Sequence, residues 1–224
     1  MIEVRELSKT YSIDGQVFKA VDNVSFTVRR GEMVSIIGHS GSGKTTLLSL
    51  IGGLTRPASG SVLIEDRAIW SMSDNDLSEF RNKKMNFIYQ FSSLVPTLTS
   101  LENIMLPTAF GDHGEDVAGY AKELLALVGL KEKENSYPSH LSGGQQRRIA
   151  IARAFINRPD IVLADEPTGD LDEETEAEII NLFNRMNKEA GTTFVIVTHN
   201  KDIAARAGHR LKMANGVVSE INGG

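Results

Sequence analysis

Residues 38–45 read GHSGSGKT and constrain the fold of this chain more than any other segment. They match the pattern G-x-x-x-x-G-K-[ST], in which a glycine-rich loop and the start of a helix hold the phosphates of a nucleotide. An apolar run at 33–37 precedes the motif, and the helix-forming stretch 46–51 follows it. The motif therefore predicts a buried strand, a phosphate-binding loop and a helix, in that order.

Each residue type in this loop has a physical role in binding phosphate. Glycines allow tight backbone turns that point N–H groups at phosphate oxygens, and the helix start adds a partial positive charge. Lys44 is predicted to contact the β- and γ-phosphates, and the Thr45 hydroxyl is predicted to bind Mg²⁺. An ordinary Gly/Ser turn before a helix is the alternative. The predicted ATP-binding residues of the loop are Gly38, His39, Ser40, Gly41, Ser42, Gly43, Lys44, Thr45 and Thr46.

An acidic pair supplies the other side of the predicted site. Asp165 ends the apolar run 161–165, where an unpaired buried carboxylate is costly unless a cation meets it, so Mg²⁺ is its expected partner. Glu166 follows directly, and strand alternation predicts that its side chain points the other way and polarises a water molecule. The alternative is that the pair caps the next turn.

Three isolated residues are weaker candidates. His199 follows the apolar run 193–197, whose end should meet the edge of the sheet where Asp165 lies, and it could hydrogen-bond the γ-phosphate. Gln90 could bind Mg²⁺ or water through its amide, and Tyr11 could stack on a base. The alternatives are ordinary loop residues for the first two, and an edge-strand aromatic packed on the core for Tyr11.

A second helix start rich in small residues lies at 141–145, which read LSGGQ. Such a start is a second candidate anion-binding end, although a merely capped helix is the alternative. The chain then has two phosphate-binding helix starts but one acidic pair. A head-to-tail dimer resolves this, with each ATP between the loop of one copy and this helix of the other. The predicted contacts from the second copy are Ser142, Gly143, Gly144 and Gln145.

Strand patterns at both ends of the chain indicate antiparallel structure. Residues 2–4 and 24–28 alternate apolar and polar side chains, and 60–65 continue this pattern. Asn215-Gly216 lies between two short strand-like segments and predicts a hairpin, because both turn positions favour positive φ. The two ends are predicted to share a sheet.

The second half of the chain indicates a parallel core. The continuous apolar runs 161–165 and 193–197 are typical of strands buried on both faces. Between them, a helix capped by Asp172 is predicted to bury one face, formed by Ile179, Leu182, Phe183 and Met186. Helical periodicity also covers 117–128 and stops at Gly129.

Composition excludes several classes of protein. With 24 Lys and Arg against 29 Asp and Glu, the net charge is −5, so general nucleic-acid binding is not expected. The absence of cysteine excludes disulfides and thiolate catalysis. The apolar runs are only a few residues long, whereas a spanning helix needs about 20. Because the first ten residues carry four charges and no signal-like stretch, the chain is predicted to stay where ATP is made.

Taken together, these motifs resemble those of the nucleotide-binding subunit of ATP-binding cassette (ABC) transporters, over nearly the whole chain. The motifs matched are the Walker A loop (38–45), the Walker B strand with its catalytic glutamate (161–166), the signature (141–145) and the D-loop (169–172). The resemblance implies that Gln90 is the Q-loop glutamine, His199 the switch histidine and Tyr11 the base-stacking aromatic. Glu166, His199 and Lys44 would then be catalytic, and Thr45, Gln90 and Asp165 would hold Mg²⁺.

The resemblance also implies a fold and a division of the chain. The expected fold is α/β, a P-loop NTPase core with a mainly parallel sheet, an N-terminal antiparallel β subdomain and an inserted α-helical subdomain. One domain would cover 1–224, with the core and β subdomain at 1–89 and 160–224 and the helical subdomain at 90–159. The implied location is peripheral, at the cytoplasmic face of the inner membrane, beside separately encoded permease subunits.

Within the family, residues 163–172 and 98–104 are most similar to the branch of lipoprotein-release, macrolide-export and cell-division ATPases. The chain departs from the family in two places: Asn200 stands where Asp commonly follows the histidine, and the segment 110–117 is shorter than in many relatives. Neither touches the proposed catalysis, but the second lies in the lobe expected to meet the permease.

Three functions fit these motifs. The leading expectation is an ATPase in which MgATP closes a homodimer and hydrolysis reopens it, driving a separate membrane permease in export or force transmission. A soluble single-cassette ATPase acting as an assembly scaffold would have the same motifs. A regulatory ATPase that controls an extracytoplasmic enzyme through a membrane partner is the third possibility.

Overall fold

The computed structural model describes residues 1–111, 116–169 and 171–221. Its strands are β1 (Ile2–Ile13), β2 (Gln16–Val28), β3 (Met33–Ile37), β4 (Ser59–Ile64), β5 (Arg67–Ala68), β6 (Met85–Ile88), β7 (Ile161–Asp165), β8 (Thr193–Thr198), β9 (His209–Ala214) and β10 (Val217–Glu220). Its helices are α1 (Lys44–Ile51), α2 (Asp74–Lys84), α3 (Ser100–Met105), α4 (Val117–Leu127), α5 (Gly143–Phe155), α6 (Glu173–Ala190) and α7 (Lys201–Arg206). Short 3₁₀ turns are η1 (Ile69–Ser71), η2 (Leu106–Phe110), η3 (Lys131–Lys133) and η4 (Pro138–His140).

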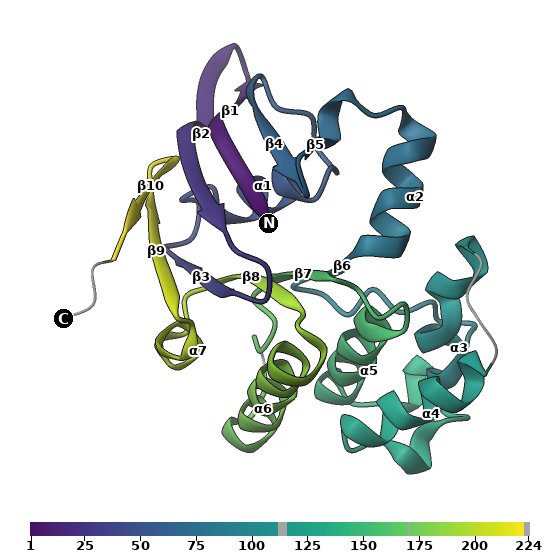
Figure 1. The fold of residues 1–224 in the computed structure, drawn as a ribbon. Helices are drawn as coiled ribbons and strands as arrows, with labels where there is room; N and C mark the ends of the chain where they lie inside the picture. Colours follow the sequence, from purple (N-terminus) through teal and green to yellow (C-terminus); the bar gives the residue numbers. More distant parts are fainter. Residues whose placement is uncertain (112–115, 170, 222–224) are drawn as a thin grey trace.

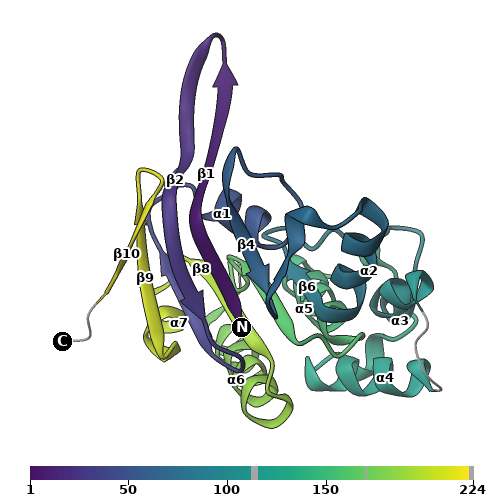
Figure 2. The same ribbon diagram turned by 45° about the horizontal axis from the view of Figure 1, so that its top comes forward.

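The strands form two sheets. An antiparallel sheet has the order β2-β1-β4-β5, and a six-stranded sheet has the order β10-β9-β3-β8-β7-β6, in which only β10 runs antiparallel to its neighbour. Figure 1 shows the β1–β2 ribbon above the six-stranded sheet and α5 and α6 below it. In Figure 2 the tip of the β1–β2 hairpin extends beyond the rest of the chain. The predicted α/β fold is confirmed.

The six-stranded sheet separates two hydrophobic cores. Along β7, Val162 and Ala164 belong to the core on the side of α5 and α6, whereas Ile161 and Leu163 belong to the core shared with α1 and the antiparallel sheet. This alternation follows from the two-residue period of a strand. Because both faces are covered, β7 and β8 are buried along their whole length, as the continuous apolar runs predicted.

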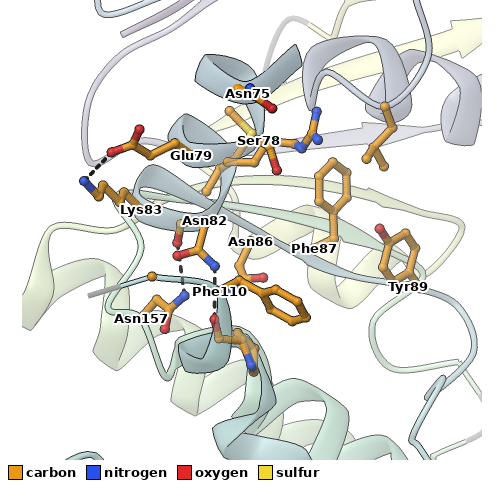
Figure 3. Close-up of a pocket in the computed structure, with 15 residues that line it drawn as sticks. Asn75, Ser78, Glu79, Asn82, Lys83, Asn86, Phe87, Tyr89, Phe110 and Asn157 are labelled. Atoms are coloured by element: carbon orange, nitrogen blue, oxygen red, sulfur yellow. Dashed lines mark hydrogen bonds and ion pairs between the residues drawn. The ribbon is translucent and has the colours of Figure 1, made fainter. Parts of the chain in front are cut away.

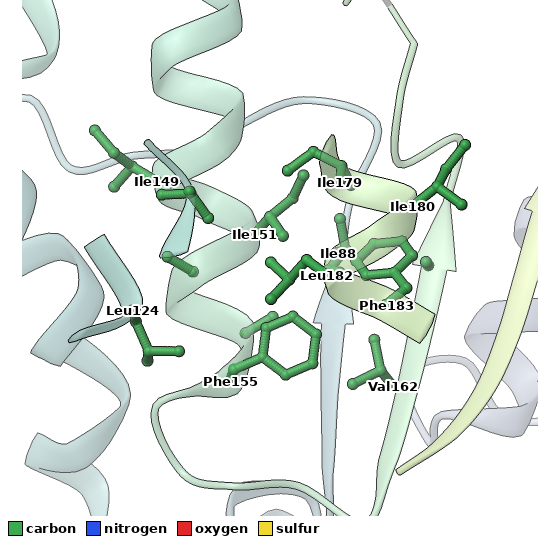
Figure 4. Close-up of a cluster of buried hydrophobic side chains, with 14 of the residues drawn as sticks. Ile88, Leu124, Ile149, Ile151, Phe155, Val162, Ile179, Ile180, Leu182 and Phe183 are labelled. Carbon is green, nitrogen blue, oxygen red and sulfur yellow. The ribbon is translucent and has the colours of Figure 1, made fainter. Parts of the chain in front are cut away.

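Three aromatic rings pack together in the core between α6 and the sheet, and Figure 4 shows two of them, those of Phe155 and Phe183. The ring centroid of Phe183 lies 5.1 Å from that of Phe194 and 6.2 Å from that of Phe155. We expect Phe183→Ala to lower the free energy of unfolding by about 3–5 kcal/mol, because it removes buried surface and leaves a cavity. Denaturant unfolding measures this loss. Phe91→Ala is the matched control: Phe91 is 75% exposed, so a change above about 0.5 kcal/mol there would contradict a core-specific effect.

The helix between the two parallel strands begins and packs as predicted. Asp172 is the N-cap of α6, and one of its carboxylate oxygens accepts a hydrogen bond from Thr175 N at 2.9 Å. Ile179, Leu182 and Phe183 are buried against the sheet. Farther back in the chain, α4 ends where Gly129 adopts φ 69°. The start of α6 and the end of α4 therefore follow the capping preferences of nearby residues.

The prediction that the two chain ends share a sheet is wrong. The hairpin at Asn215-Gly216 forms, but β9 pairs with β3 and thus extends the six-stranded sheet rather than the antiparallel one. A backbone hydrogen bond of 2.9 Å from Asp22 N to Gly216 O connects the hairpin turn to β2. The reason is burial: Leu211 and Met213 of β9 pack into the core beside Ile36 of β3, and strand alternation alone does not reveal the partner strand.

Helix α2 was not predicted from the sequence. It is mostly polar, and only Leu77 and Phe80 are buried. Its start nevertheless carries a signal, because the Ser73 side chain accepts a hydrogen bond from Asp76 N at 3.2 Å. Acidic residues in its first turn and basic residues in its last turn also suit the helix dipole.

Candidate active site

The loop between β3 and α1 leaves no space for a side chain at two positions. Gly43 has φ 105°, and a Cβ there would lie 2.0 Å from Ala20 O. A Cβ on Gly38 would lie 2.3 Å from Met213 O. The start of α1 has no side-chain cap, so its first N–H groups remain available to an anion. The loop thus has the shape and polarity that phosphate binding requires.

Lys44 is mostly buried, with 8% of its surface exposed. Its Nζ donates hydrogen bonds to Gly38 O at 2.7 Å and to His39 O at 3.1 Å. These contacts hold the ammonium group across the mouth of the loop. A positive charge fixed beside free N–H groups favours a polyanionic ligand.

Asp165 ends β7 and is 8% exposed. Burial raises the pKa of its carboxyl above the ordinary value; the hydrogen bond with the Thr45 side chain opposes this shift, and the nearby Glu166 charge adds to it. The Thr45 hydroxyl, the Gln90 amide and the Asp165 carboxylate all line one pocket. Such oxygen donors suit Mg²⁺, which is usually held by one or two carboxylates, water and substrate phosphates. No group of three or more His, Cys, Asp or Glu with metal-binding spacing occurs among the described residues.

The side chain of Glu166 departs from its predicted direction. Strand alternation predicted that it points away from Asp165, but both residues line the same pocket. The cause is the backbone: β7 ends at Asp165, and Glu166 has φ 45°. The positive φ takes Glu166 out of the strand conformation, and its carboxylate contacts Thr198 and His199 at the end of β8, so the alternation rule does not apply beyond the last strand residue.

The Glu166 carboxylate is held by the end of β8. Its Oε2 accepts hydrogen bonds from Thr198 Oγ1 at 3.0 Å and from His199 N at 3.2 Å. Its Oε1 lies 3.0 Å from His199 Nδ1. The His199 side chain is 76% exposed, whereas that of Glu166 is 14% exposed. An orienting network therefore fixes the carboxylate while the imidazole reaches into solvent.

These groups converge on a cavity of about 800 Å³. It collects residues from the phosphate loop, the ends of β7 and β8, and the segment after β6. The predicted site residues that line it are Ser40, Gly41, Ser42, Gly43, Lys44, Thr45, Thr46, Gln90, Asp165, Glu166 and His199. Gly38 and His39 instead form the wall of the loop behind Lys44.

The structure brings a different aromatic residue from the predicted one to this cavity. Phe18 and Ala20 of β2 line it, whereas Tyr11 does not. Tyr11 pairs with Phe18 across the β1–β2 hairpin, and Lys9 Nζ lies 5.3 Å from the centroid of the Tyr11 ring. Phe18 was missed, although its two-residue spacing from Ala20 indicates a shared face. Base stacking by Tyr11 stays a prediction.

The second helix start lies outside the cavity. Ser142 is the N-cap of α5: its Oγ accepts a hydrogen bond from Gln145 N at 3.3 Å, and Ser142 N donates to Gln145 Oε1 at 3.0 Å. This capping box is the local structure that the alternative interpretation expected, and Gly143 is exposed beside it. Of the D-loop, Gly169 lines the cavity and Asp172 caps α6, while Asp170 lies outside the described residues.

The family of the chain is identified by its match to a known family model. A family model described as ABC transporter matches residues 21–169, a span that holds the phosphate loop, the LSGGQ helix start and the acidic pair. The chain belongs to the ABC transporter family. The ABC ATPase is 45% identical to the lipoprotein-releasing system ATP-binding protein LolD of Bordetella avium, over 96% of this chain and 94% of that protein. It is 42% identical to the LolD of Myxococcus xanthus, over 98% and 99% of the two chains.

Solved structures agree with the family assignment. A dimeric structure of the ATP-binding cassette MJ0796, in a post-hydrolysis state bound to ADP and Pi, has a TM-score of 0.93 and 38% identity, covering 100% of both chains. CbiO1 of Clostridium perfringens, part of an ABC transporter complex, has a TM-score of 0.84 and 28% identity over 97% of this chain and 86% of that chain. The ABC ATPase is accordingly the ATP-hydrolysing subunit of a transporter and uses ATP with Mg²⁺. None of the described helices combines the length and the apolar character needed to cross a bilayer.

Proposed function

We propose that this ABC ATPase hydrolyses ATP as a head-to-tail dimer at the cytoplasmic face of the inner membrane and drives a separate membrane subunit that releases lipoproteins. The single observation that carries the ATPase part is the convergence of the phosphate loop, Asp165, Glu166 and His199 on one cavity. The lipoprotein part rests on the similarity to LolD proteins over nearly the full length of both chains.

In the proposed reaction, the loop N–H groups and Lys44 bind the β- and γ-phosphates and offset charge that develops during transfer. Bound Mg²⁺ would be held by Thr45, Gln90 and Asp165 and would supply charge neutralisation. Glu166 accepts a proton from the attacking water as the water oxygen bonds to the γ-phosphorus and the bond to the ADP oxygen breaks. His199, whose Nδ1 lies 3.0 Å from Glu166 Oε1, orients that carboxylate and can hydrogen-bond the γ-phosphate.

The dimer is proposed because one chain does not complete the site. Ser142, Gly143, Gly144 and Gln145 do not line the cavity of their own chain, yet they offer an exposed helix start to an anion. A two-fold arrangement would set this start against the ATP of the second copy and would give two equivalent sites. The dimeric state described for the MJ0796 cassette supports this arrangement.

A groove beside the helices is the proposed docking site for a short helix of the membrane subunit (Figure 3). It has a volume of about 680 Å³ and is lined by α2, β6, η2 and the residues after β6. Its apolar side chains include Phe87, Tyr89 and Phe110, of which Phe110 is 75% exposed. An amphipathic helix in an apolar groove is a common mode of recognition.

The position of this groove supports force transmission. Tyr89 lines the groove, and the next residue, Gln90, lines the nucleotide cavity. A helix that moves in the groove would therefore displace Tyr89, and the peptide bond to Gln90 would carry this displacement into the nucleotide cavity. The groove wall includes Gly111, but residues 112–115 lie outside the described residues, so the effect of the short 110–117 segment on partner choice stays a prediction.

The raised pKa of Asp165 leads to a prediction about metal binding. Only the ionised carboxylate binds Mg²⁺, and burial raises the pKa of this carboxyl group. The increase in ATP affinity that Mg²⁺ causes should therefore become larger as the pH rises. It should become constant only at a pH above the ordinary aspartate pKa of about 3.9. Calorimetric titrations with and without Mg²⁺, from about pH 5 to pH 8, measure this gain. Asp165→Asn is the control, because it should show a smaller gain and keep only the pH dependence that formation of MgATP itself contributes. Identical profiles for the two proteins would contradict a metal-binding role of Asp165.

Copurification tests the proposed function. Tagged Glu166→Gln protein is purified with MgATP from detergent-solubilised cells of the native host, and its partners are identified by mass spectrometry. We expect a stoichiometric multi-spanning membrane protein. Phe110→Asp in the same background should lose this partner because it places a charge in the groove, whereas Tyr137→Asp, at a side chain 41% exposed outside the groove, should keep it. Recovery of soluble proteins only would overturn the proposed separate membrane subunit and favour the assembly scaffold.

Reconstitution then tests the substrate. The ABC ATPase and its recovered membrane partner are placed in vesicles that carry a purified lipoprotein, and released lipoprotein is measured after addition of ATP. We expect release that requires both ATP and an intact Glu166. A partner that stimulates ATP turnover without releasing lipoprotein would contradict the substrate class and leave the ATPase assignment standing.

A further inference from the structure

Arg147, in the second turn of α5, is buried beneath the nucleotide site with 4% of its surface exposed. Its guanidinium donates hydrogen bonds to three backbone carbonyls: Nη1 to Tyr89 O, Nη2 to Glu166 O and Nε to Pro167 O, the last at 2.9 Å. The planar fork of an arginine can serve several acceptors in fixed directions, which a lysine cannot do. One side chain thus connects the LSGGQ helix, the segment before Gln90 and the backbone of Glu166.

The contact with Glu166 occurs where the backbone most needs support. Glu166 has φ 45°, a conformation that non-glycine residues adopt at a cost of about 1–3 kcal/mol unless their surroundings impose it. Hydrogen bonds hold the backbone of this residue on both sides: Glu166 N donates to Val197 O at 2.9 Å, and Glu166 O accepts from the Arg147 guanidinium and from Gly169 N, the latter at 3.1 Å. Removal of the guanidinium would leave the Glu166 carbonyl with only the short-range contact from Gly169 N, and the direction in which the carboxylate points would be less tightly fixed.

We propose that Arg147 is a positioning residue that fixes Glu166 for proton transfer and links its orientation to the LSGGQ helix and to the wall of the docking groove. Arg147 does not line the nucleotide cavity, so its effect passes through other residues. This inference rests on the proposed role of Glu166 as the base. A movement of α5 on dimer closure, or of Tyr89 on docking of the membrane subunit, would be transmitted to the Glu166 carbonyl through one guanidinium.

Arg153 provides a matched control from the same helix. Its guanidinium also donates to two backbone carbonyls, Ser92 O and Ser93 O, each at 2.9 Å. Both arginines therefore connect α5 to the segment after β6, but it is Arg147 that donates hydrogen bonds to Glu166 O and Pro167 O. A general loosening of this segment should appear in both variants, whereas mispositioning of Glu166 should appear in Arg147 variants alone.

The test compares steady-state ATP hydrolysis by Arg147→Gln, Arg147→Lys and Arg153→Gln. We expect Arg147→Gln to lower kcat by about 10–100-fold, because misplacement of a reacting group by 1 Å can lower the rate by this order. KM for ATP should change by less than about threefold, since an interaction used only in the transition state affects kcat. Arg147→Lys should fall between wild type and Arg147→Gln, and Arg153→Gln should keep kcat within about threefold of wild type.

A double-mutant cycle separates this inference from the proposed function. In the Glu166→Gln background, Arg147→Gln should lower residual single-turnover hydrolysis by less than about twofold, because its route of action is already removed. A full additional loss there, an equal kcat loss in Arg153→Gln, or a change confined to KM would overturn the inference. If the Arg147→Gln protein does not fold, the Arg147→Lys protein is used for the test instead. An unchanged kcat in Arg147→Lys would then overturn the inference. Unchanged turnover in Glu166→Gln alone would instead remove Glu166 as the base and overturn the proposed mechanism.

Discussion

Glu166→Gln protein is expected to lose ATP turnover by about 10²–10⁴-fold, the usual contribution of a positioned general base. The amide keeps the size of the side chain and can still accept a hydrogen bond from Thr198 Oγ1, which lies 3.0 Å from the wild-type carboxylate. It cannot accept a proton from water. Because Lys44 and the loop are unchanged, MgATP should still bind, and the closed dimer should accumulate because hydrolysis no longer reopens it.

Phosphate release measures the turnover, and light scattering after gel filtration with MgATP measures the dimer. Glu189→Gln is the matched control, since Glu189 is exposed and pairs with Arg185 at 2.9 Å on the surface of α6. It should keep wild-type turnover and reversible association. Unchanged turnover in Glu166→Gln would exclude Glu166 as the base, while loss of ATP binding would mean that the substitution damages the site as a whole.

Lys44→Ala should weaken ATP binding by about 10–100-fold, because a charge-assisted hydrogen bond contributes about 1.5–3 kcal/mol. The substitution also removes the hydrogen bonds from Lys44 Nζ to Gly38 O and His39 O, so the mouth of the phosphate loop loses its internal support. The substitution leaves the rest of the cavity lining, including Phe18, unchanged. Discrimination between ATP and AMP should therefore fall along with affinity.

Equilibrium binding of fluorescent ATP and AMP analogues measures both effects. Lys122→Ala is the control for removal of a lysine charge, since Lys122 pairs with Glu134 at 3.1 Å far along the chain in α4. It should bind both ligands as the wild type does. Equal affinity of Lys44→Ala and wild type for ATP would contradict the proposed contact between Lys44 and the phosphates.

The phosphate loop could be predicted from the sequence because its constraints are local. The turns and close approaches at Gly38 and Gly43 leave no room for a side chain, and the first four residues of the strand before the loop are buried. The same holds for α6, where Asp172 forms the cap and a single apolar face packs on the sheet. In these segments, short-range rules and burial agree.

The remaining features depend on contacts between distant segments. The direction of the Glu166 side chain follows from its φ of 45°. Hydrogen bonds to Val197 and Arg147, both distant in the sequence, support this backbone conformation. Phe18 reaches the cavity because the β1–β2 hairpin lies over the loop. Strand alternation gives the faces of β9 but not its pairing with β3. Sequence patterns specify elements and faces, whereas tertiary packing decides which faces meet.

Mixing two inactive variants tests the shared ATP site most directly. Lys44→Ala removes the phosphate-binding charge, and Ser142→Arg blocks the exposed helix start of α5, so each variant alone should have little turnover. In their heterodimer, one site combines both defects, and the other combines an intact phosphate loop with an intact LSGGQ start. We expect ATP turnover to recover on mixing, in proportion to heterodimer formed in the presence of ATP. No recovery, in a mixture in which heterodimers are shown to form, would contradict ATP hydrolysis between two copies of this chain.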